Sequence, residues 1–247
     1  MAAALGWGLF AASSLLIGAV IGLKLPIGER LIGLILGFGA GTLISAVSFE
    51  LADEAFRLGG ADTLTLGLAL GALAYFVGDL VIARRGATQR MHPGPRMDST
   101  PQGADTATAL LLGAILDGIP ESVVIGIGLI GGGGVSAAVV SAVFISNLPE
   151  SIASSRGMRE QGMGTRHVLV TWTLVVLVSG LAAAAGYGLL KDASGNTVAL
   201  LEAFAGGAVL TMLIDTMIPE SHEHAGRATG LATVLGFALA YLLGTLD

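Results

Sequence analysis

The 247-residue sequence contains no cysteine, and only 12% of its residues are charged. The first absence excludes disulfide bonds and thiolate metal sites. Soluble globular proteins are usually about a quarter charged, whereas this sequence is 53% hydrophobic and has a mean hydropathy of +0.82. The net charge of −6 provides no basic surface, so we expect no nucleic-acid partner. The composition predicts an all-α integral membrane protein whose main partner is the lipid bilayer.

Apolar runs of about 20 residues can cross a bilayer as helices. The N-terminus is apolar almost from Met1 and lacks a basic stretch, so we expect a first span there and not a cleaved signal. Residues 84–106 are rich in proline, glycine and polar side chains, which predicts a flexible cytoplasmic loop. The sequence predicts one transmembrane domain over residues 1–247, with eight transmembrane helices near 4–23, 31–52, 63–83, 107–129, 135–155, 167–190, 198–220 and 228–246.

Basic residues are distributed unevenly over the predicted loops. Of the 12 Lys and Arg residues, only Arg57 and Lys191 fall on one side of the membrane. The positive-inside rule therefore places loops 3–4 and 5–6 in the cytoplasm and both termini outside. We expect the protein in the inner (plasma) membrane of the cell. Its 38 glycines allow close helix packing and are compatible with a homodimer.

Acidic residues occur inside the apolar spans, where no lysine or arginine lies deep enough to neutralise them. Asp117 and Glu121 lie one helical turn apart on the fourth span, and Asn147 and Glu150 share a face of the fifth. A proline directly precedes each of these glutamates and frees the helical carbonyl four residues back. A carboxylate at mid-bilayer costs about 2.5–3.5 kcal/mol. The repeated phrase therefore predicts a cation site shared by spans 4 and 5.

A second pair of acidic phrases closes spans 2 and 7. Glu50 and Glu54 lie in "SFELADEAF", and Asp215 and Glu220 lie in "IDTMIPESHEH". The two phrases close opposite ends of the membrane, as an inverted repeat of spans 1–3 and 6–8 would require. We expect these acids to line the entrance and exit of a pathway or to form a secondary metal site. For Glu54 and Glu220, an interfacial position in contact with water explains the sequence equally well.

Two histidines, His222 and His224, follow the seventh span. Together they can bind a divalent ion at the exit of the pathway, although a short solvated loop would also explain them. Glu202 is expected near an interface.

The Pro-Glu phrases in the fourth and fifth of eight spans resemble the ZIP (Zrt/Irt-like) family of divalent metal permeases. The family's fourth span typically reads His-Asn-x-Pro-Glu-Gly, and this sequence has "DGIPES" at 117–122; the fifth-span phrase corresponds to "SNLPES" at 146–151. The resemblance covers essentially the whole chain. It implies a 3+2+3 arrangement of helices, metal-bridging roles for Glu121 and Glu150, and flanking ligand roles for Asp117 and Asn147.

The sequence resembles a divergent member of this family. Every histidine that the family uses inside the membrane is missing, Gly118 replaces a ligating asparagine, and the sixth span has no acid. These departures leave one or two metals as alternatives for the centre.

The predicted function is transmembrane transport of a divalent metal cation, which is a substrate, and no organic cofactor is expected. Oxygen ligands suit Mn, Fe(II), Mg or Ca better than zinc, but zinc also accepts carboxylates. Zn, Mn, Fe and Cd are therefore the candidates. The alternative is a proton- or monovalent-cation-coupled carrier of another solute that uses the same acids. No nucleophile accompanies these acids, so we do not expect an enzyme.

Overall fold

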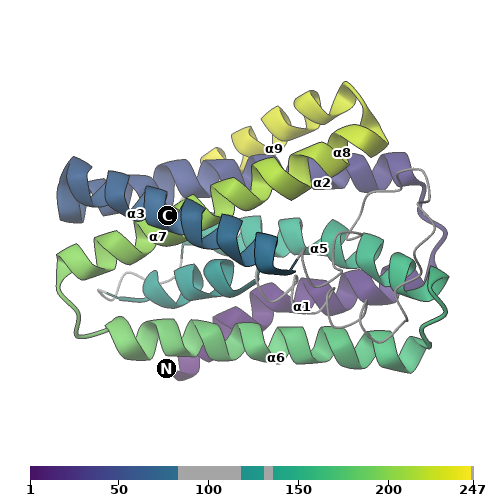
Figure 1. Ribbon diagram of the computed structural model, residues 1–247, viewed down its shortest axis with the longest axis horizontal. Helices are drawn as coiled ribbons and strands as arrows, with labels where there is room; N and C mark the ends of the chain where they lie inside the picture. The colour runs from purple at the N-terminus through teal and green to yellow at the C-terminus, as the bar shows by residue number, and fades with distance from the viewer. Residues whose placement is uncertain (83–117, 131–135, 246–247) are drawn as a thin grey trace.

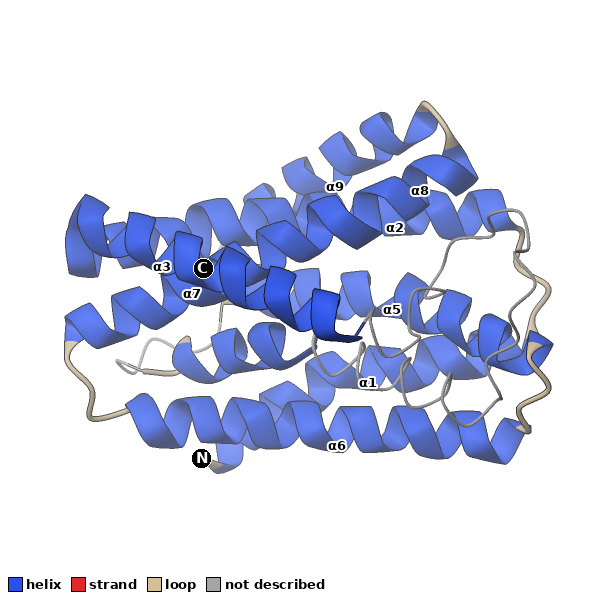
Figure 2. Cartoon of the chain, viewed as in Figure 1, coloured by secondary structure: helices blue, strands red, loops and turns tan. Residues whose placement is uncertain are grey.

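The computed structural model describes residues 1–82, 118–130 and 136–245. These residues form helices and contain no strand (Figure 2). Asp117 and the predicted loop at 84–106 lie outside the described residues. The elements are α1 (Ala2–Lys24), α2 (Glu29–Ala46), the π-helix η1 (Val47–Leu51), α3 (Ala52–Ile82), a helix over Gly118–Ile127, α5 (Ala137–Glu160), α6 (Thr165–Leu190), α7 (Gly195–Met212), the π-helix η3 (Leu213–Met217), α8 (Ile218–Ala225) and α9 (Ala228–Gly244).

Five of the described helices are long and apolar enough to cross a membrane. They are Ala2–Lys24, Glu29–Val81, Ala137–Glu160, Thr165–Leu190 and Gly195–Ala225. The second of them contains a break at Gly60, whose φ of 73° and ψ of −178° are not helical. Figure 1 shows the chain reversing direction within α3, so that most of α3 runs back in the direction opposite to α2. A single glycine at positive φ thus makes a turn where the sequence predicted a loop over residues 53–62.

Two other helices begin at a serine that caps them. The Ser136 hydroxyl accepts a hydrogen bond from the Val139 amide at 3.4 Å, and α5 follows. The Ser194 hydroxyl accepts one from the Thr197 amide at 3.3 Å, and α7 follows. Serine is favoured at this position because it satisfies an amide that the helix leaves free.

Helix α5 lies at the centre of the bundle. It packs against α1 on one side and against α2 on the other. Figure 1 shows α1 and α6 on one side of α5, with α2, α8 and α9 on the opposite side. Arg156 and Arg159 donate hydrogen bonds to the carbonyls of Ile27 and Leu23, which ties the last turns of α5 to the end of α1 and the turn after it.

Glycines bring α2 and α9 into backbone contact. A Cβ at Gly41 would lie 1.9 Å from the carbonyl oxygen of Thr233, and a Cβ at Gly236 would lie 2.0 Å from that of Phe38. Such approaches are possible only for glycine, and small residues at crossings are typical of helices that pack in lipid.

The crossing of α7 and α3 uses the same arrangement. A Cβ at Gly207 would lie 2.1 Å from the carbonyl oxygen of Leu68, and a Cβ at Gly71 would lie 1.8 Å from that of Phe204. In α2 and in α7 alike, a phenylalanine is followed three residues later by the crossing glycine. The crossing of α2 with α9 and the crossing of α7 with α3 therefore use the same residue types and the same glycine-to-carbonyl contact.

The outward faces of α3, α6 and α9 are apolar. Their exposed large side chains are those of Leu66, Leu70, Leu73, Phe76 and Val77 on α3, Val170, Leu174, Leu177 and Leu181 on α6, and Leu231, Val234, Leu235 and Leu242 on α9. Exposed apolar surface on this scale is unusual for a soluble monomer. It is the surface expected of a bundle surrounded by lipid.

Candidate functional site

Glu121 lies in the helix Gly118–Ile127 and is only 4% exposed. Helix α6 packs tightly against this helix, because a Cβ at Gly126 would lie 2.1 Å from the carbonyl oxygen of Ala183. The neighbouring Ser122 is also buried, and its hydroxyl donates to the Gly118 carbonyl at 2.6 Å. Glu121 is therefore a buried carboxylate on a closely packed helix.

The second predicted pair lies in the middle of α5. Asn147 is 4% exposed and Glu150 is half-buried. Pro149 lies inside the helix, so the carbonyl of Ile145 has no amide donor four residues ahead of it. The Ser151 hydroxyl donates to the carbonyls of Asn147 at 2.9 Å and Leu148 at 3.0 Å. This turn of α5 thus carries a carboxylate, an amide and an under-bonded carbonyl.

Glycines of neighbouring helices fix the position of this turn. A Cβ at Gly18 of α1 would lie 2.1 Å from Ser151 Oγ and 2.4 Å from the Leu148 carbonyl oxygen. A Cβ at Gly39 of α2 would lie 2.9 Å from the Cα of Ser146. The candidate ligands of α5 are therefore held between two helix backbones.

The two halves of the candidate site belong to one core. Val124 and Ile125 from the first helix share a hydrophobic cluster with Val143 and Ile152 of α5. Among the described residues, no group of three or more His, Asp or Glu side chains lies close enough to hold a metal. The predicted ligand Asp117 is outside that part of the chain, so the four-residue centre of Asp117, Glu121, Asn147 and Glu150 stays a prediction.

The acids Glu50 and Asp215 both lie in π-helices. Glu50 is in η1 and Asp215 is in η3, and each π-helix continues an 18-residue α-helix. Glu50 is half-buried, and its Oε1 would lie 2.8 Å from a Cβ at Gly244, while Asp215 is exposed. Single π-turns inside α-helices are concentrated at functional sites. The sequence analysis did not anticipate them.

Glu54 and Glu220 differ in their surroundings. Glu54 accepts a hydrogen bond from Arg57, which also forms an ion pair with Asp53 at 3.4 Å. Glu220 is 5% exposed in α8, and the adjacent Ser221 donates to the carbonyl of Gly33 at 2.7 Å. The structure therefore gives Glu54 a cationic partner and buries Glu220 within the protein.

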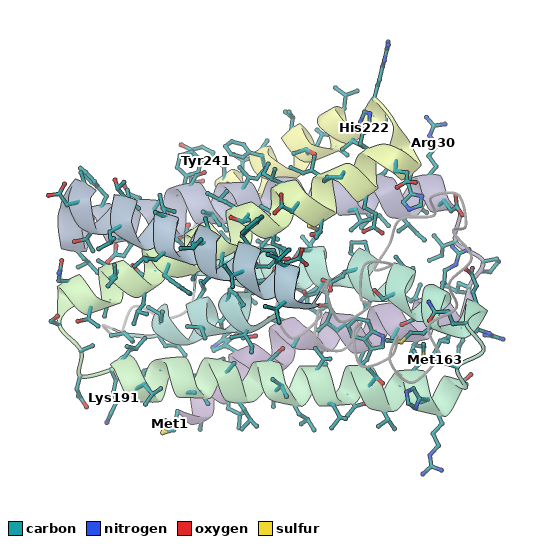
Figure 3. The ribbon with its side chains drawn as sticks, in the orientation of Figure 1. Met1, Arg30, Met163, Lys191, His222 and Tyr241 are labelled. Carbon is teal, nitrogen blue, oxygen red and sulfur yellow. The ribbon has the colours of Figure 1, made fainter. Side chains whose placement is uncertain are left out.

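His222 and His224 lie in α8 and not in a solvated loop. His222 lines a cavity of about 630 Å³ between α8 and α9, together with Glu223 and Thr233. The Nδ1 of His224 lies 3.8 Å from the Oε2 of Glu29. Residues two apart on a helix point to different sides, so the structure does not bring the two imidazoles together. Figure 3 shows His222 at the same end of the bundle as Arg30, and Lys191 at the other end.

Glu202 is a buried acid whose place the sequence analysis did not anticipate. It is only 6% exposed, and its Oε2 has no hydrogen-bond partner; its expected position near an interface stays a prediction. The signal in the sequence is its position inside the apolar run "VALLEAFAGG", with no basic residue nearby.

No protein-family model matches the sequence. The chain is 24% identical over 235 residues to an Arabidopsis thaliana protein named "Putative zinc transporter At3g08650". The match covers 93% of this chain but only 36% of that protein, so the chain spans little more than a third of the relative's length. Over most of its length the chain is thus similar to a protein named as a metal transporter.

Proposed function

We propose that the chain is a divergent ZIP-like permease that moves a divalent metal cation across a membrane. The ion would bind at Glu121, Asn147 and Glu150, with Asp117 as a fourth ligand. It would pass Glu50 on one side and Asp215 on the other. The similarity to a protein named as a zinc transporter supports metal transport as the class of function.

The observation that carries this proposal is an imbalance of buried charge. Glu121, Glu202 and Glu220 are each at most 6% exposed. Among the described residues no lysine or arginine is buried; the least exposed of them, Arg156, is half-buried and bonded to a carbonyl. Burying a carboxylate is costly unless its charge is compensated, and a bound divalent cation would compensate several of them at once.

The donor set favours hard and borderline cations. Carboxylate, amide and carbonyl oxygens suit Mn²⁺ and Fe²⁺, and Zn²⁺ accepts carboxylates as well. The proposed cargo is therefore Zn²⁺, Mn²⁺, Fe²⁺ or Cd²⁺, with no organic cofactor.

The proposed architecture is eight transmembrane helices in a 3+2+3 arrangement with inverted repeats. The matched glycine crossings of α2 with α9 and of α7 with α3 support it, because an inverted repeat relates these two pairs. The π-helices η1 and η3, each after an 18-residue α-helix, also support it.

The proposed topology has both termini outside, in the inner (plasma) membrane. Arg159 bonds to the end of α1 and Arg156 to the turn between α1 and α2, so these basic residues lie at one end of the bundle together with Arg30 (Figure 3). That end would face the cytoplasm. Association as a homodimer is part of the same proposal.

Metal uptake into proteoliposomes tests the function. Purified protein would be challenged with Zn²⁺, Mn²⁺, Fe²⁺, Cd²⁺, Mg²⁺ and Ca²⁺, and compared with the double variant Glu121→Gln/Glu150→Gln. Glutamine preserves side-chain shape and removes only the charge. The matched control is Glu160→Gln, at the exposed end of α5.

We expect saturable uptake of a subset of these metals, lost in the double variant and retained in Glu160→Gln. Absence of uptake of every metal by folded wild-type protein would contradict the proposal. A proton current carried without metal would instead favour the carrier of another solute.

A further inference from the structure

Glu202 lies about 10 Å along α7 from its start, at a rise of about 1.5 Å per residue. Its side chain is buried, and its Oε2 makes no hydrogen bond. Leaving a carboxylate in this state is costly. A proton or a bound cation at this position would remove that cost.

The neighbours of Glu202 on α7 show what it faces. Ala199 and Gly206 share its side of the helix. A Cβ at Gly59 would lie 2.8 Å from the Cβ of Ala199, and a Cβ at Gly206 would lie 3.9 Å from the Cβ of Leu51. Glu202 lies between these two contacts and therefore faces the helical segment between Leu51 and Gly59.

That segment contains Ala55 and Glu54. Ala55 is fully buried and belongs to one apolar cluster with Ala199 and Ala203 of α7. Glu54 lies three residues after Leu51 and directly before Ala55, so it lies on or beside the face of α3 that meets α7. Glu54 and Glu202 therefore come from facing sides of the interface of α3 and α7.

Packing alone does not require an acid at this position. In the matched crossing of α2 with α9, Phe38 corresponds to Phe204 and Gly41 to Gly207. The residue two before Phe38 is Leu36, which is 1% exposed, and the residue two before Phe204 is Glu202. A buried leucine therefore serves at the equivalent place in one half of the bundle.

We propose that Glu202 and Glu54 form a second cation station, in which their carboxylate oxygens take up a divalent metal ion at the Lys191 end of the bundle. This inference rests on the divalent-cation transport proposed above. Arg57, which is bonded to Glu54 and is 66% exposed, is the resident counter-charge that the arriving ion displaces. The station captures the ion before the centre on α5.

Equilibrium dialysis with Mn²⁺ and with Zn²⁺ tests the station separately from the centre. The background is full-length protein carrying Glu121→Gln/Glu150→Gln, which leaves the second station intact. To it are added Glu202→Gln, the control Asp62→Asn, which removes an exposed acid of α3 close to Gly60, or Arg57→Gln. Thermal unfolding confirms that each variant is folded.

We expect the background protein to keep a weak metal-binding site. Glu202→Gln should weaken it about tenfold or more, the effect of losing one charge-assisted contact. Asp62→Asn should leave it unchanged, and Arg57→Gln should tighten it.

Two results would overturn the station: no residual binding in the background protein, or equal binding in the Glu202→Gln and Asp62→Asn variants. Uptake by otherwise wild-type protein separates this failure from failure of the transport proposal. Transport with no effect of Glu202→Gln on the half-saturating concentration removes only the station. Residual binding that depends on Glu202 without any uptake removes only the transport.

Discussion

The contact between α1 and α5 at Gly18 makes a sharp prediction. In Gly18→Ala the new methyl group would lie 2.4 Å from the carbonyl oxygen of Leu148 and 2.1 Å from Ser151 Oγ. The serine can rotate away, but the carbonyl belongs to the backbone of α5. Since non-bonded carbon contacts are favourable at about 3.5–4.0 Å, α5 must move by about 1 Å.

The matched control is Gly6→Ala in the same helix, where a Cβ has no neighbour within 4 Å. Both substitutions raise the helix propensity of α1 equally. The difference in stability between the two variants therefore measures the cost of overpacking at Gly18. Overpacking of a closely packed site costs about 1–3 kcal/mol. We expect Gly18→Ala to be less stable than Gly6→Ala by this amount in thermal or denaturant unfolding in detergent.

Metal uptake should fall as well, because α5 carries Asn147 and Glu150. Ligand distances in metal sites hold to within about 0.2 Å, and a shift of about 1 Å exceeds this tolerance. If Gly18→Ala matches Gly6→Ala in both stability and uptake, the reasoning that α1 fixes the candidate site is refuted.

Three further changes test other parts of the account. Pro149→Ala restores an amide donor for the Ile145 carbonyl, so we expect a stabilisation of up to about 3 kcal/mol together with reduced metal uptake; unchanged uptake would show that the free carbonyl is not used. Ser221→Ala removes the hydrogen bond to Gly33 and should cost about 1 kcal/mol in unfolding measurements, whereas Ser13→Ala, at a half-buried serine that bonds only within α1, should cost less; equal costs would argue against a stabilising contact between α8 and α2. Arg159→Met removes the bond to the Leu23 carbonyl and should cost about 1–2 kcal/mol, with Arg166→Met, at an exposed arginine of α6, as the silent control.

Hydropathy predicted most of the helices, since long apolar runs identify segments that can be buried in lipid. Several helices continue beyond the predicted spans, whose bounds stay predictions. The segment "SRGMRE" is polar yet continues α5 to Glu160, because hydropathy reports membrane contact and not helix propensity. Likewise, residues between Ala52 and Gly60 are helical although Asp53, Glu54 and Arg57 are polar.

The candidate site rests in part on local sequence. The Pro-Glu phrases predict Glu121 and Glu150 as ligands, and the structure buries Glu121 and half-buries Glu150. The burial of Glu202 was not predictable in this way, because it depends on α3 and α7, which are distant in sequence. The π-helices η1 and η3 were also missed, since an extra residue in one helical turn leaves no compositional signal.

The X-ray absorption spectrum of a metal bound to the purified protein tests the central claim most directly. The account predicts a first shell of oxygen atoms at about 2.0–2.2 Å for zinc, without scattering from imidazole rings. With at most one equivalent of metal added, it predicts that this tightly bound metal is lost in Glu121→Gln/Glu150→Gln, where only the weak station at Glu202 and Glu54 remains, and retained in His222→Ala/His224→Ala. An imidazole-containing shell that survives the glutamate changes would contradict a carboxylate centre on the helix Gly118–Ile127 and α5.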